Sequence, residues 1–332
     1  MPASGNGISV VICCYNSSAR LPRTLEHLAR QALPGKLPLE VIVVDNNSTD
    51  GTREVALWEW KKLQNPFPLM VVEQPVQGLT HAREKGIGAA SYDIILLCDD
   101  DNWLCPDYAE KVFRIMSSDP RVGVLGGRGE AVTDGVFPSW FSSFQSAYAV
   151  GAQNLESGDV SKRGYLWGAG MALRKSVVQR FWQLGFSSLL TDRKGNELSS
   201  GGDSELCKWF LLAGYKLWYE ESLVFQHYIP SERLTIPYFR KMQQGHDRSF
   251  RVLKKYDMLL SATTATTWFR AKKLSSHLMG LLKALLFLNS RGIKKNLVNL
   301  SLFSPLESLV FDSDIKKIRS MIRLAKNALA NP

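Results

Sequence analysis

The chain has 332 residues and a formal net charge of +10, with 45% hydrophobic and 22% charged residues. This length exceeds the size at which one hydrophobic core usually stops growing, so it argues against a single small domain and predicts one large domain with an appendage. The composition is ordinary for a globular protein. The charge is unevenly spread, because the segment from Trp268 to Pro332 holds twelve Lys or Arg residues against three acidic ones. The basic character therefore belongs to the end of the chain.

Cysteine usage and the first residues predict the cellular compartment. The number of cysteines is odd and no pair has the C-x-x-C spacing of a redox or zinc motif, so they are interpreted as reduced residues of a protein inside the cell. The first residues, MPASGNGISVV, lack a basic segment followed by an apolar one, so no secretory signal is expected. The cysteines are Cys13, Cys14, Cys98, Cys105 and Cys207.

The first hundred residues alternate between apolar runs and segments with helical spacing. Runs such as ISVVICC and LEVIVVD contain no alternating polar residues, which predicts strands buried on both faces of a sheet. Strands separated by helices indicate an α/β fold, doubly wound, with a mostly parallel central sheet and helices on both faces. The predicted strands are 8–14, 39–45, 70–73 and 93–98, and the predicted helices lie at 21–32, 53–63 and 80–90.

Polar residues follow three of these strands at the points where the strands end. The carboxyl ends of parallel strands lie at one edge of a sheet, and ligands bind at that edge in doubly wound folds. Neither G-x-G-x-x-G nor G-x-x-x-x-G-K-[ST] occurs, so the sequence predicts a nucleotide site of another kind. The residues at this edge are Cys14, Tyr15, Asn16, Asp45, Asp99, Asp100 and Asp101.

Six segments in the first 240 residues are informative together: SVVICCYN, VIVVDNNSTDGT, GLTHAREKGIGAASYDIILLCDDDNWLCPD, YLWGAGMALRKSV, GGDSELC and QHYIPSERLT. They resemble segments of the inverting glycosyltransferases of family 2, which have the nucleotide-sugar-binding GT-A fold. They occur in the expected order and together span about residues 8–240. The resemblance implies a GT-A fold and an enzyme that uses a nucleotide-sugar donor. A C-terminal helical extension, which the resemblance does not cover, is expected to follow this fold.

The acidic triplet resembles the D-x-D motif of the family, which implies a divalent cation, Mn2+ or Mg2+, beside the diphosphate of the donor. Such cations take one or two carboxylates and complete their shell with phosphate oxygens and water. The resemblance assigns metal contacts to Asp101, Asp99 and His227 and places Asp100 near the ribose. A structural role is the alternative for His227. Asn102 stands where many relatives have another Asp, which leaves the number of metal-binding carboxylates open. A solvated acidic turn is the alternative interpretation.

The other donor contacts are assigned by the same resemblance. It implies that Tyr15 stacks on the nucleobase, that Asp45 reads the N–H edge of the base, and that Arg83 approaches the nucleotide. Packing in the core is the alternative for Tyr15 and Trp167, and a surface position is the alternative for Arg83. The expected donor-binding residues are Cys14, Tyr15, Asn16, Asp45, Arg83, Asp99, Asp100, Trp167 and Gly168.

Inverting transfer needs a general base, because the acceptor hydroxyl has a pKa far above neutrality. In GGDSELCKWFLLAGY, two glycines precede Asp203 at the start of a predicted helix. Relatives usually read Gly-Glu-Asp-x-Asp or Glu here, so this chain has Gly202 in place of the first Glu. The resemblance makes Asp203 the base and places Gly202 and Glu205 on the acceptor side, with a supporting role also open for Glu205. A helix cap is the alternative role for Asp203.

The predicted domains are a catalytic domain at 1–245, with a nucleotide half at about 1–125 and an acceptor/sugar half at about 126–245, and a basic helical extension at 246–332. The run LMGLLKALLFL at 278–288 is shorter than the roughly 20 apolar residues that span a bilayer. With its basic neighbours and the later IKKIRSMIRLAKNAL, it indicates amphipathic helices suited to an anionic membrane surface. Packing on the catalytic domain or a dimer interface is the alternative. No nucleic-acid partner is expected, because no recognition motif accompanies the charge.

The sequence thus predicts a metal-dependent inverting glycosyltransferase. Its donor is a UDP-sugar, with a GDP-sugar as the second choice, and its acceptor is a hydroxyl of a lipid-linked glycan or a polysaccharide. It is expected on the inner face of the cell membrane, in polysaccharide biosynthesis of the cell envelope. One alternative is a nucleotidyltransferase of related fold, which would be expected to show a Gly-rich phosphate loop that SVVICCYN lacks. The other is a catalytically silent scaffold that binds sugar nucleotides. The oligomeric state is left open.

Overall fold

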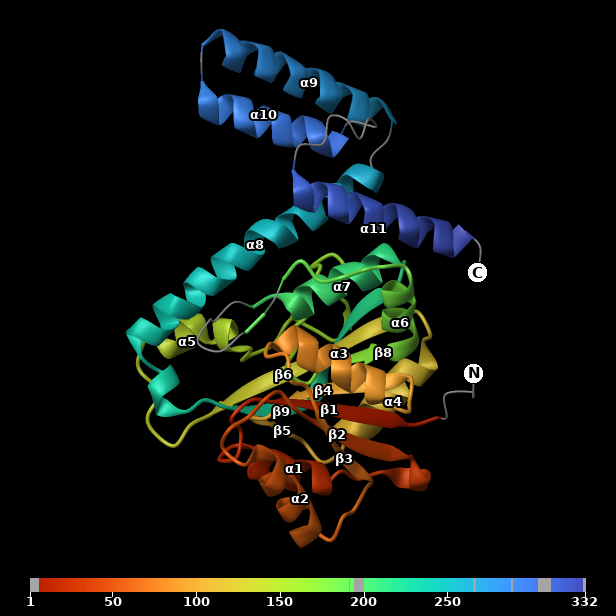
Figure 1. Ribbon diagram of the computed structural model, residues 1–332, viewed down its shortest axis with the longest axis vertical. Coiled ribbons are helices and arrows are strands. Elements are labelled where there is room, and N and C mark those ends of the chain that lie inside the picture. The colour runs from red at the N-terminus through yellow and green to blue at the C-terminus, as the bar shows by residue number, and fades with distance from the viewer. Residues whose placement is uncertain are drawn as a thin grey trace. The chain divides into compact units, whose positions relative to one another are not determined.

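The computed structural model describes residues 6–190, 192–193, 200–264, 267–287, 289–303 and 312–330 (Figure 1). The chain divides into two compact units. The first unit comprises Met1–Gln183 and Leu190–Ser249, and the second comprises Leu184–Leu189 and Phe250–Pro332. Each unit is described by itself.

The N-terminal half of the sheet is parallel. Strands β1 (Ile8–Cys14), β2 (Leu39–Asp45), β3 (Leu69–Glu73) and β4 (Ile94–Asp99) lie in the order β3-β2-β1-β4. They agree with the four predicted strands to within one residue at each end, because buried parallel strands require uninterrupted apolar runs. In the pairing register, Cys14 lies opposite Asp45 and Cys13 lies opposite Asp99. The ends of β1, β2 and β4 are therefore level, and the polar residues that follow them share one edge.

The second half of the sheet is mixed. In the described part of the chain, β4 pairs antiparallel with β8, β8 with β6, and β6 runs parallel to β9. Strand β5 pairs antiparallel with β9 and places Asn102 opposite His227. The order β3-β2-β1-β4-β8-β6-β9-β5, with β7 on β9, makes one sheet and confirms the predicted fold class. These strands are β5 (Asn102–Leu104), β6 (Val122–Val132), β7 (Gly158–Asp159), β8 (Ala172–Arg174) and β9 (Lys216–Tyr228).

Helices cover both faces of the parallel strands. Figure 1 shows α1 and α2 on one side of β1 and β2, and α3 on the other. In α1, the buried residues Leu21, Leu25 and Leu28 recur at helical spacing and form the face that packs on the sheet. The helices of the first unit are α1 (Leu21–Ala29), η1 (Pro34–Lys36), α2 (Thr52–Lys62), α3 (Leu79–Ala89), α4 (Tyr108–Ser118), α5 (Phe141–Phe144), η2 (Gln145–Tyr148), α6 (Lys175–Gln183), α7 (Gly202–Leu212), η3 (Ser231–Arg233) and the beginning of α8 (Ile236–Thr264).

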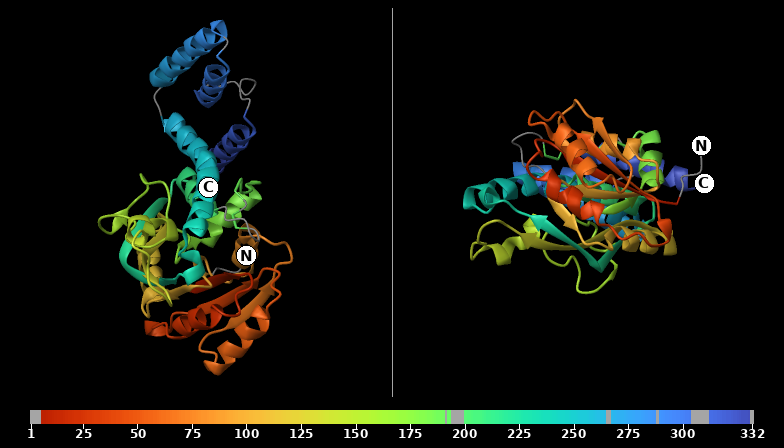
Figure 2. Two further views of the ribbon diagram at one scale, coloured as in Figure 1. Left: turned by 90° about the vertical axis from the view of Figure 1, so that its left-hand side faces the viewer. Right: turned by 90° about the horizontal axis from the view of Figure 1, so that it is seen from below.

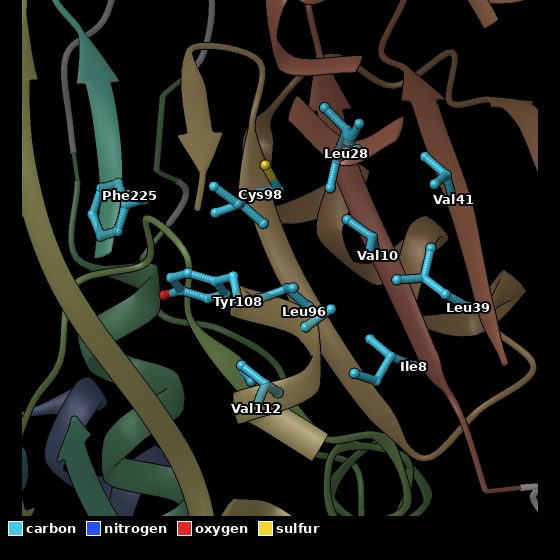
Figure 3. Packing of buried hydrophobic residues seen from close by; sticks show 14 of the residues in the cluster. Ile8, Val10, Leu28, Leu39, Val41, Leu96, Cys98, Tyr108, Val112 and Phe225 are labelled. Atoms are coloured by element: carbon cyan, nitrogen blue, oxygen red, sulfur yellow. The ribbon is translucent and has the colours of Figure 1, made fainter. Parts of the chain in front are cut away.

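The main hydrophobic core lies between the sheet and α1 and α4 (Figure 3). Tyr108 of α4 is fully buried beside Phe225 of β9, and its hydroxyl donates a hydrogen bond to the Gly170 carbonyl oxygen at 2.7 Å. Gly170 has φ +66, and a Cβ there would lie 2.5 Å from the Tyr108 hydroxyl, so only glycine suits this position. The core thereby fixes the segment that runs from Trp167 into β8.

The second unit is helical. Helices α9 (Thr267–Leu286) and α10 (Ser290–Phe303) lie side by side (Figure 2), and α11 (Ser313–Ala330) follows. The end of α8 is tied to the start of α11, because the Lys255 ammonium contacts Asp312 at 2.9 Å and Asp314 at 2.7 Å. No helix among the described residues has the length and apolar character to cross a membrane. Leu288 of the predicted amphipathic run lies outside the described residues.

Candidate active site

The acidic triplet forms the turn between β4 and β5. Asp100 is 9% exposed, and its carboxylate accepts a hydrogen bond from Arg20 Nη2 at 2.6 Å. Thr24 Oγ1 donates to the Asp100 carbonyl oxygen at 2.8 Å, so α1 holds both the side chain and the main chain of the turn. Burial, then the neighbouring Asp101 charge, raises the pKa of Asp100, and Arg20 opposes this rise. Burial and Asp101 likewise raise the pKa of Asp99.

Asp101 faces two basic side chains. Its Oδ2 accepts a hydrogen bond from Arg233 Nη1 at 2.9 Å, and its Oδ1 lies 3.5 Å from His227 Nε2. Burial acts to raise the pKa of the Asp101 carboxyl, but the charges of His227 and Arg233 outweigh burial and lower it. Asp101 is therefore the member of the triplet that is held most firmly in its ionised form.

His227 is oriented by a main-chain carbonyl. Its Nδ1 lies 2.7 Å from the Tyr148 carbonyl oxygen, and because a carbonyl can only accept, Nδ1 carries a hydrogen. Nε2 is therefore the nitrogen that faces Asp101. Burial acts to lower the pKa of His227, but the Asp101 carboxylate raises it overall. His227 lies within β9, where it pairs with Asn102 of β5 on one side and with Ala131 of β6 on the other.

The carboxylate and imidazole atoms at this turn fit a divalent cation that takes its remaining ligands from outside the protein. The described residues contain no group of three or more His, Cys, Asp or Glu side chains that is arranged to hold a metal ion. Asp101 Oδ1 and His227 Nε2 nevertheless point at each other, with the other nitrogen of the imidazole already oriented. A cation that takes one or two protein ligands and several phosphate oxygens needs no larger protein set.

The loops after β1 and β2 are joined at the same edge. Asn16, which has φ +49, accepts a hydrogen bond from the Thr49 main-chain N–H at 2.9 Å, and Asp45 accepts one from the Ser48 N–H at 3.0 Å. The Tyr15 side chain is 40% exposed, as a stacking platform requires. The Cys14 side chain is 1% exposed and packs in the core, so it points away from this edge.

Arg83 of α3 is buried at the bottom of the site. Its Nη1 donates to Asp192 Oδ2 at 2.6 Å. Burial acts to lower the pKa of Arg83, but the negative charges of Asp192, Asp203 and Asp99 raise it overall. Arg83 is thus a buried cation surrounded by carboxylates, which excludes the surface position that the sequence left open.

Asp203 lies in the first turn of α7 and faces Gly168. Its Oδ2 accepts a hydrogen bond from the Gly168 N–H at 2.7 Å, and its Oδ1 accepts one from the Ser204 N–H at 2.7 Å. The cap residue of α7 is Gly201, which has no side chain to cap the helix. A Cβ on Gly168 would lie 3.1 Å from both Arg83 Nη2 and Asp203 Cβ. Asp203 and Arg83 therefore flank one glycine.

Three other residues that the sequence assigned to the site, Gly202, Glu205 and Trp167, have hydrogen-bond partners within the protein. Glu205 is 1% exposed, and its Oε2 accepts a hydrogen bond from the Leu190 N–H at 3.1 Å, which favours a supporting role over contact with the acceptor. Gly202 donates its N–H to Asp192 Oδ1 at 2.7 Å. The Trp167 N–H donates to Gln153 Oε1 at 2.9 Å.

Three charged residues of the site were not singled out from the sequence. They are Arg20, Asp192 and Arg233, which contact Asp100, Arg83 and Asp101 respectively. Arg233 lies inside the recognised segment QHYIPSERLT, so its basic side chain could have been predicted to belong to the site. Arg20 and Asp192 lie outside the recognised segments, and their roles follow only from the tertiary structure.

Fold and site together define a doubly wound α/β protein with an acidic turn at the carboxyl edge of its sheet. Within this class, the chain matches the family described as Glycosyl transferase family 2 over residues 9–182, which is more than half of its length. The chain therefore belongs to glycosyl transferase family 2.

Individual relatives agree with this membership. The chain is 35% identical over 107 residues to "Putative glycosyltransferase EpsH" of Bacillus subtilis, a match that covers 32% of this chain and 29% of the relative. It is 30% identical over 224 residues to "Glycosyltransferase AglE" of Haloferax volcanii, covering 66% of each chain. The matched parts thus span between about a third and two thirds of these relatives.

A solved structure shares the fold. The crystal structure of S. aureus TarS 1-349 in complex with UDP-GlcNAc has a TM-score of 0.54 with this chain at 15% sequence identity. The similarity covers 97% of this chain and 91% of that one. At this identity the similarity concerns the fold alone, and it confirms the predicted GT-A architecture.

Proposed function

We propose that this chain transfers a sugar, with inversion, from a nucleoside-diphosphate sugar to a hydroxyl of a lipid-linked or polysaccharide acceptor. A UDP-sugar is the favoured donor. Family membership supports the reaction class, and the complex of TarS with UDP-GlcNAc supports a UDP-sugar for this fold. A polysaccharide acceptor is supported by the relative named "Poly-beta-1,6-N-acetyl-D-glucosamine synthase" of Staphylococcus epidermidis, which is 29% identical over 121 residues.

One observation carries the proposal: the side chains of Asp203 and Arg83 both lie close to Gly168, and the negative charge of Asp99 in the acidic triplet also acts on Arg83. Inverting transfer needs a base on one side of the reacting carbon and positive charge toward the leaving diphosphate on the other. Gly168 has no side chain, and a Cβ there would lie 3.1 Å from both Arg83 Nη2 and Asp203 Cβ, so glycine lets these two side chains lie close together. In this arrangement Asp203 accepts the proton of the acceptor hydroxyl, and Arg83 attracts the donor.

A divalent cation fits beside the acidic triplet. Asp101 and His227 would hold it, with Asp99 as a further carboxylate, and when bound it would offset the negative charge that develops on the departing diphosphate. Arg20 keeps Asp100 in place beside it, where Asp100 is proposed to approach the ribose. Tyr15 is proposed to stack on the base, and Asp45 to accept hydrogen bonds from its N–H edge.

The donor is testable by thermal unfolding. We expect a UDP-sugar with Mn2+ to raise the melting temperature of the full chain, while the same sugar with EDTA has a much smaller effect. A ligand that binds only the folded state stabilises it by about 2.7 kcal/mol at a hundredfold excess over its dissociation constant, so the shift is readily measured. GDP-, CMP- and dTDP-sugars serve as controls. Equal shifts for every nucleotide, or none for any, would contradict the proposed donor class.

We also propose that the second unit places the enzyme on the inner face of the cell membrane. The apolar face of α9 is exposed, with exposures from 49% at Leu285 to 80% at Leu286. Gly280 and Ala284, on the opposite side of the helix, pack against Asn296 and Gly292 of α10. The lysines and arginine nearby complement anionic lipid headgroups, each contributing about 1 kcal/mol near the surface. The apolar face consists of Leu278, Met279, Leu282, Leu285 and Leu286, with exposed Phe287 directly after the helix, and its basic neighbours are Lys272, Lys273, Lys283, Arg291, Lys294 and Lys295.

The membrane proposal predicts that Leu282→Glu with Leu286→Glu abolishes cosedimentation with phosphatidylglycerol vesicles. Two carboxylates on this face oppose both insertion of the apolar side chains and attraction to the headgroups. Leu155→Glu is the matched control, because Leu155 is 98% exposed in the first unit. Unchanged cosedimentation would contradict the proposal. If the wild type were a dimer that bound no vesicles, and the double variant were a monomer, the apolar face would instead be an interface between two copies.

A further inference from the structure

Asp192 is a buried carboxylate that the proposed mechanism leaves unused. It is 2% exposed, and both of its oxygens are engaged: Oδ2 accepts from Arg83 Nη1 at 2.6 Å, and Oδ1 accepts from the Gly202 N–H at 2.7 Å. Arg83 belongs to α3, and Gly202 is the first residue of α7. One carboxylate therefore joins the cation of the donor site to the helix that carries the base.

The first turn of α7 depends on this contact. The N-terminal N–H groups of a helix have no partner within the helix, and a carboxylate near them is favoured by the helix dipole. The cap residue, Gly201, has no side chain to offer. Asp192 accepts from the Gly202 N–H in its place, one residue before Asp203. A shift of this turn would move the Asp203 carboxylate relative to Gly168 and Arg83.

The same contact leaves no space for a side chain at Gly202, the position at which the family resemblance leads us to expect a glutamate. A Cβ on Gly202 would lie 2.3 Å from Asp192 Oδ2, so no larger residue fits at 202 while Asp192 keeps its place. The Asp192 carboxylate thus occupies the space toward which a glutamate at 202 would project. Asp192 itself has φ +51, a conformation that most residues adopt only with strain.

We propose that Asp192 is a positioning residue that supplies, from outside the GGDSELC segment, the carboxylate that this chain lacks at position 202. It holds the Arg83 guanidinium and the first turn of α7 in one arrangement, so that Arg83 and Asp203 are both kept close to Gly168. The inference rests on the proposed sugar transfer for its effect on catalysis, but the contact itself is independent of the donor.

The test moves the carboxylate from one position to the other. Asp192→Gly removes it, and glycine is chosen because it adopts φ +51 without strain. We expect kcat to fall about 10²-fold, as a displacement of about 1 Å in a reacting group can cause. The double variant Asp192→Gly with Gly202→Glu should have a kcat at least about tenfold higher than that of Asp192→Gly. Gly202→Glu alone should lose activity, because its side chain meets Asp192. Asp192→Asn, which keeps an acceptor for the Gly202 N–H but no charge for Arg83, should lie between wild type and Asp192→Gly.

Two controls separate positioning from general stability and from the proposed function. Glu40→Gln removes another buried carboxylate, bonded to Ser9 and Ser91 at the opposite end of the sheet, and should lower the melting temperature without changing kcat. Melting temperatures of the Asp192 variants are read without a donor, and the double variant should melt above Asp192→Gly. Suppose that the wild type transfers sugar. The positioning role is then overturned if Asp192→Gly has the same kcat as the wild type, or if the double variant recovers none of the lost kcat. A wild type that transfers no sugar while the melting pattern holds overturns the proposed function alone.

Discussion

Replacing Asp203 by Asn is expected to lower kcat for sugar transfer by about 10²- to 10⁴-fold, the usual contribution of a positioned general base. The amide oxygen of the variant would still accept a hydrogen bond from the Gly168 N–H, which Asp203 Oδ2 now does at 2.7 Å. The amide would not accept the proton of the acceptor hydroxyl. Donor affinity should change little, because Asp203 acts on the acceptor. Initial rates at saturating UDP-sugar, with donor affinity from thermal unfolding, measure the two effects separately.

The control for this substitution is Asp159→Asn. Asp159 is an exposed residue of the first unit whose Oδ1 also accepts a main-chain N–H, that of Ser161, at 2.9 Å. The Asp159→Asn variant should have the same kcat and donor affinity as the wild type. If Asp203→Asn kept full transfer activity, the assignment of the base would be wrong although the chain would remain a member of its family. A fall in melting temperature without a change in kcat would instead indicate a role in the helix alone.

The parallel half of the fold was predictable because its information is local. Buried parallel strands require continuous apolar runs, and ISVVICC and LEVIVVD stand out for that reason. Once the strands are parallel and in register, the residues after β1, β2 and β4 must share an edge. The sequence therefore predicted the proximity of Tyr15, Asp45 and Asp99 without any knowledge of side-chain contacts.

The contacts that complete the site depend on residues far apart in the chain. Arg233 and Asp101 are separated by 132 positions, and Arg83 and Asp192 by 109. No local pattern marks such pairs, because they arise from the pairing of β5 with β9 and from the approach of the segment before α7 to α3. His227 was recognised by resemblance, but its orientation by the Tyr148 carbonyl follows from the structure only.

The second large effect is expected at the acidic triplet, where Asp101→Asn should abolish the difference between Mn2+ and EDTA in donor-induced stabilisation. Asp101 is the triplet member that lies beside His227 Nε2, and an amide is a much poorer ligand for a hard cation than a carboxylate. The free energy of unfolding without ligand should also fall, by about 3 kcal/mol, because Arg233 loses the charge of its buried partner. The readout is therefore the metal-dependent part of the shift, measured against the melting temperature of each variant itself.

Asp100→Asn is the matched control within the same turn. The Asp100 carboxylate is bonded to Arg20 at 2.6 Å, on the side of the turn held by α1, so its loss should weaken donor binding while the difference between Mn2+ and EDTA persists. The two neighbouring carboxylates would then have separate roles, Asp101 toward the cation and Asp100 toward the nucleoside. If Asp101→Asn kept the full metal-dependent shift, the cation would have to be held elsewhere. If both variants lost it equally, the triplet would act as one acidic surface rather than as a site with a defined ligand.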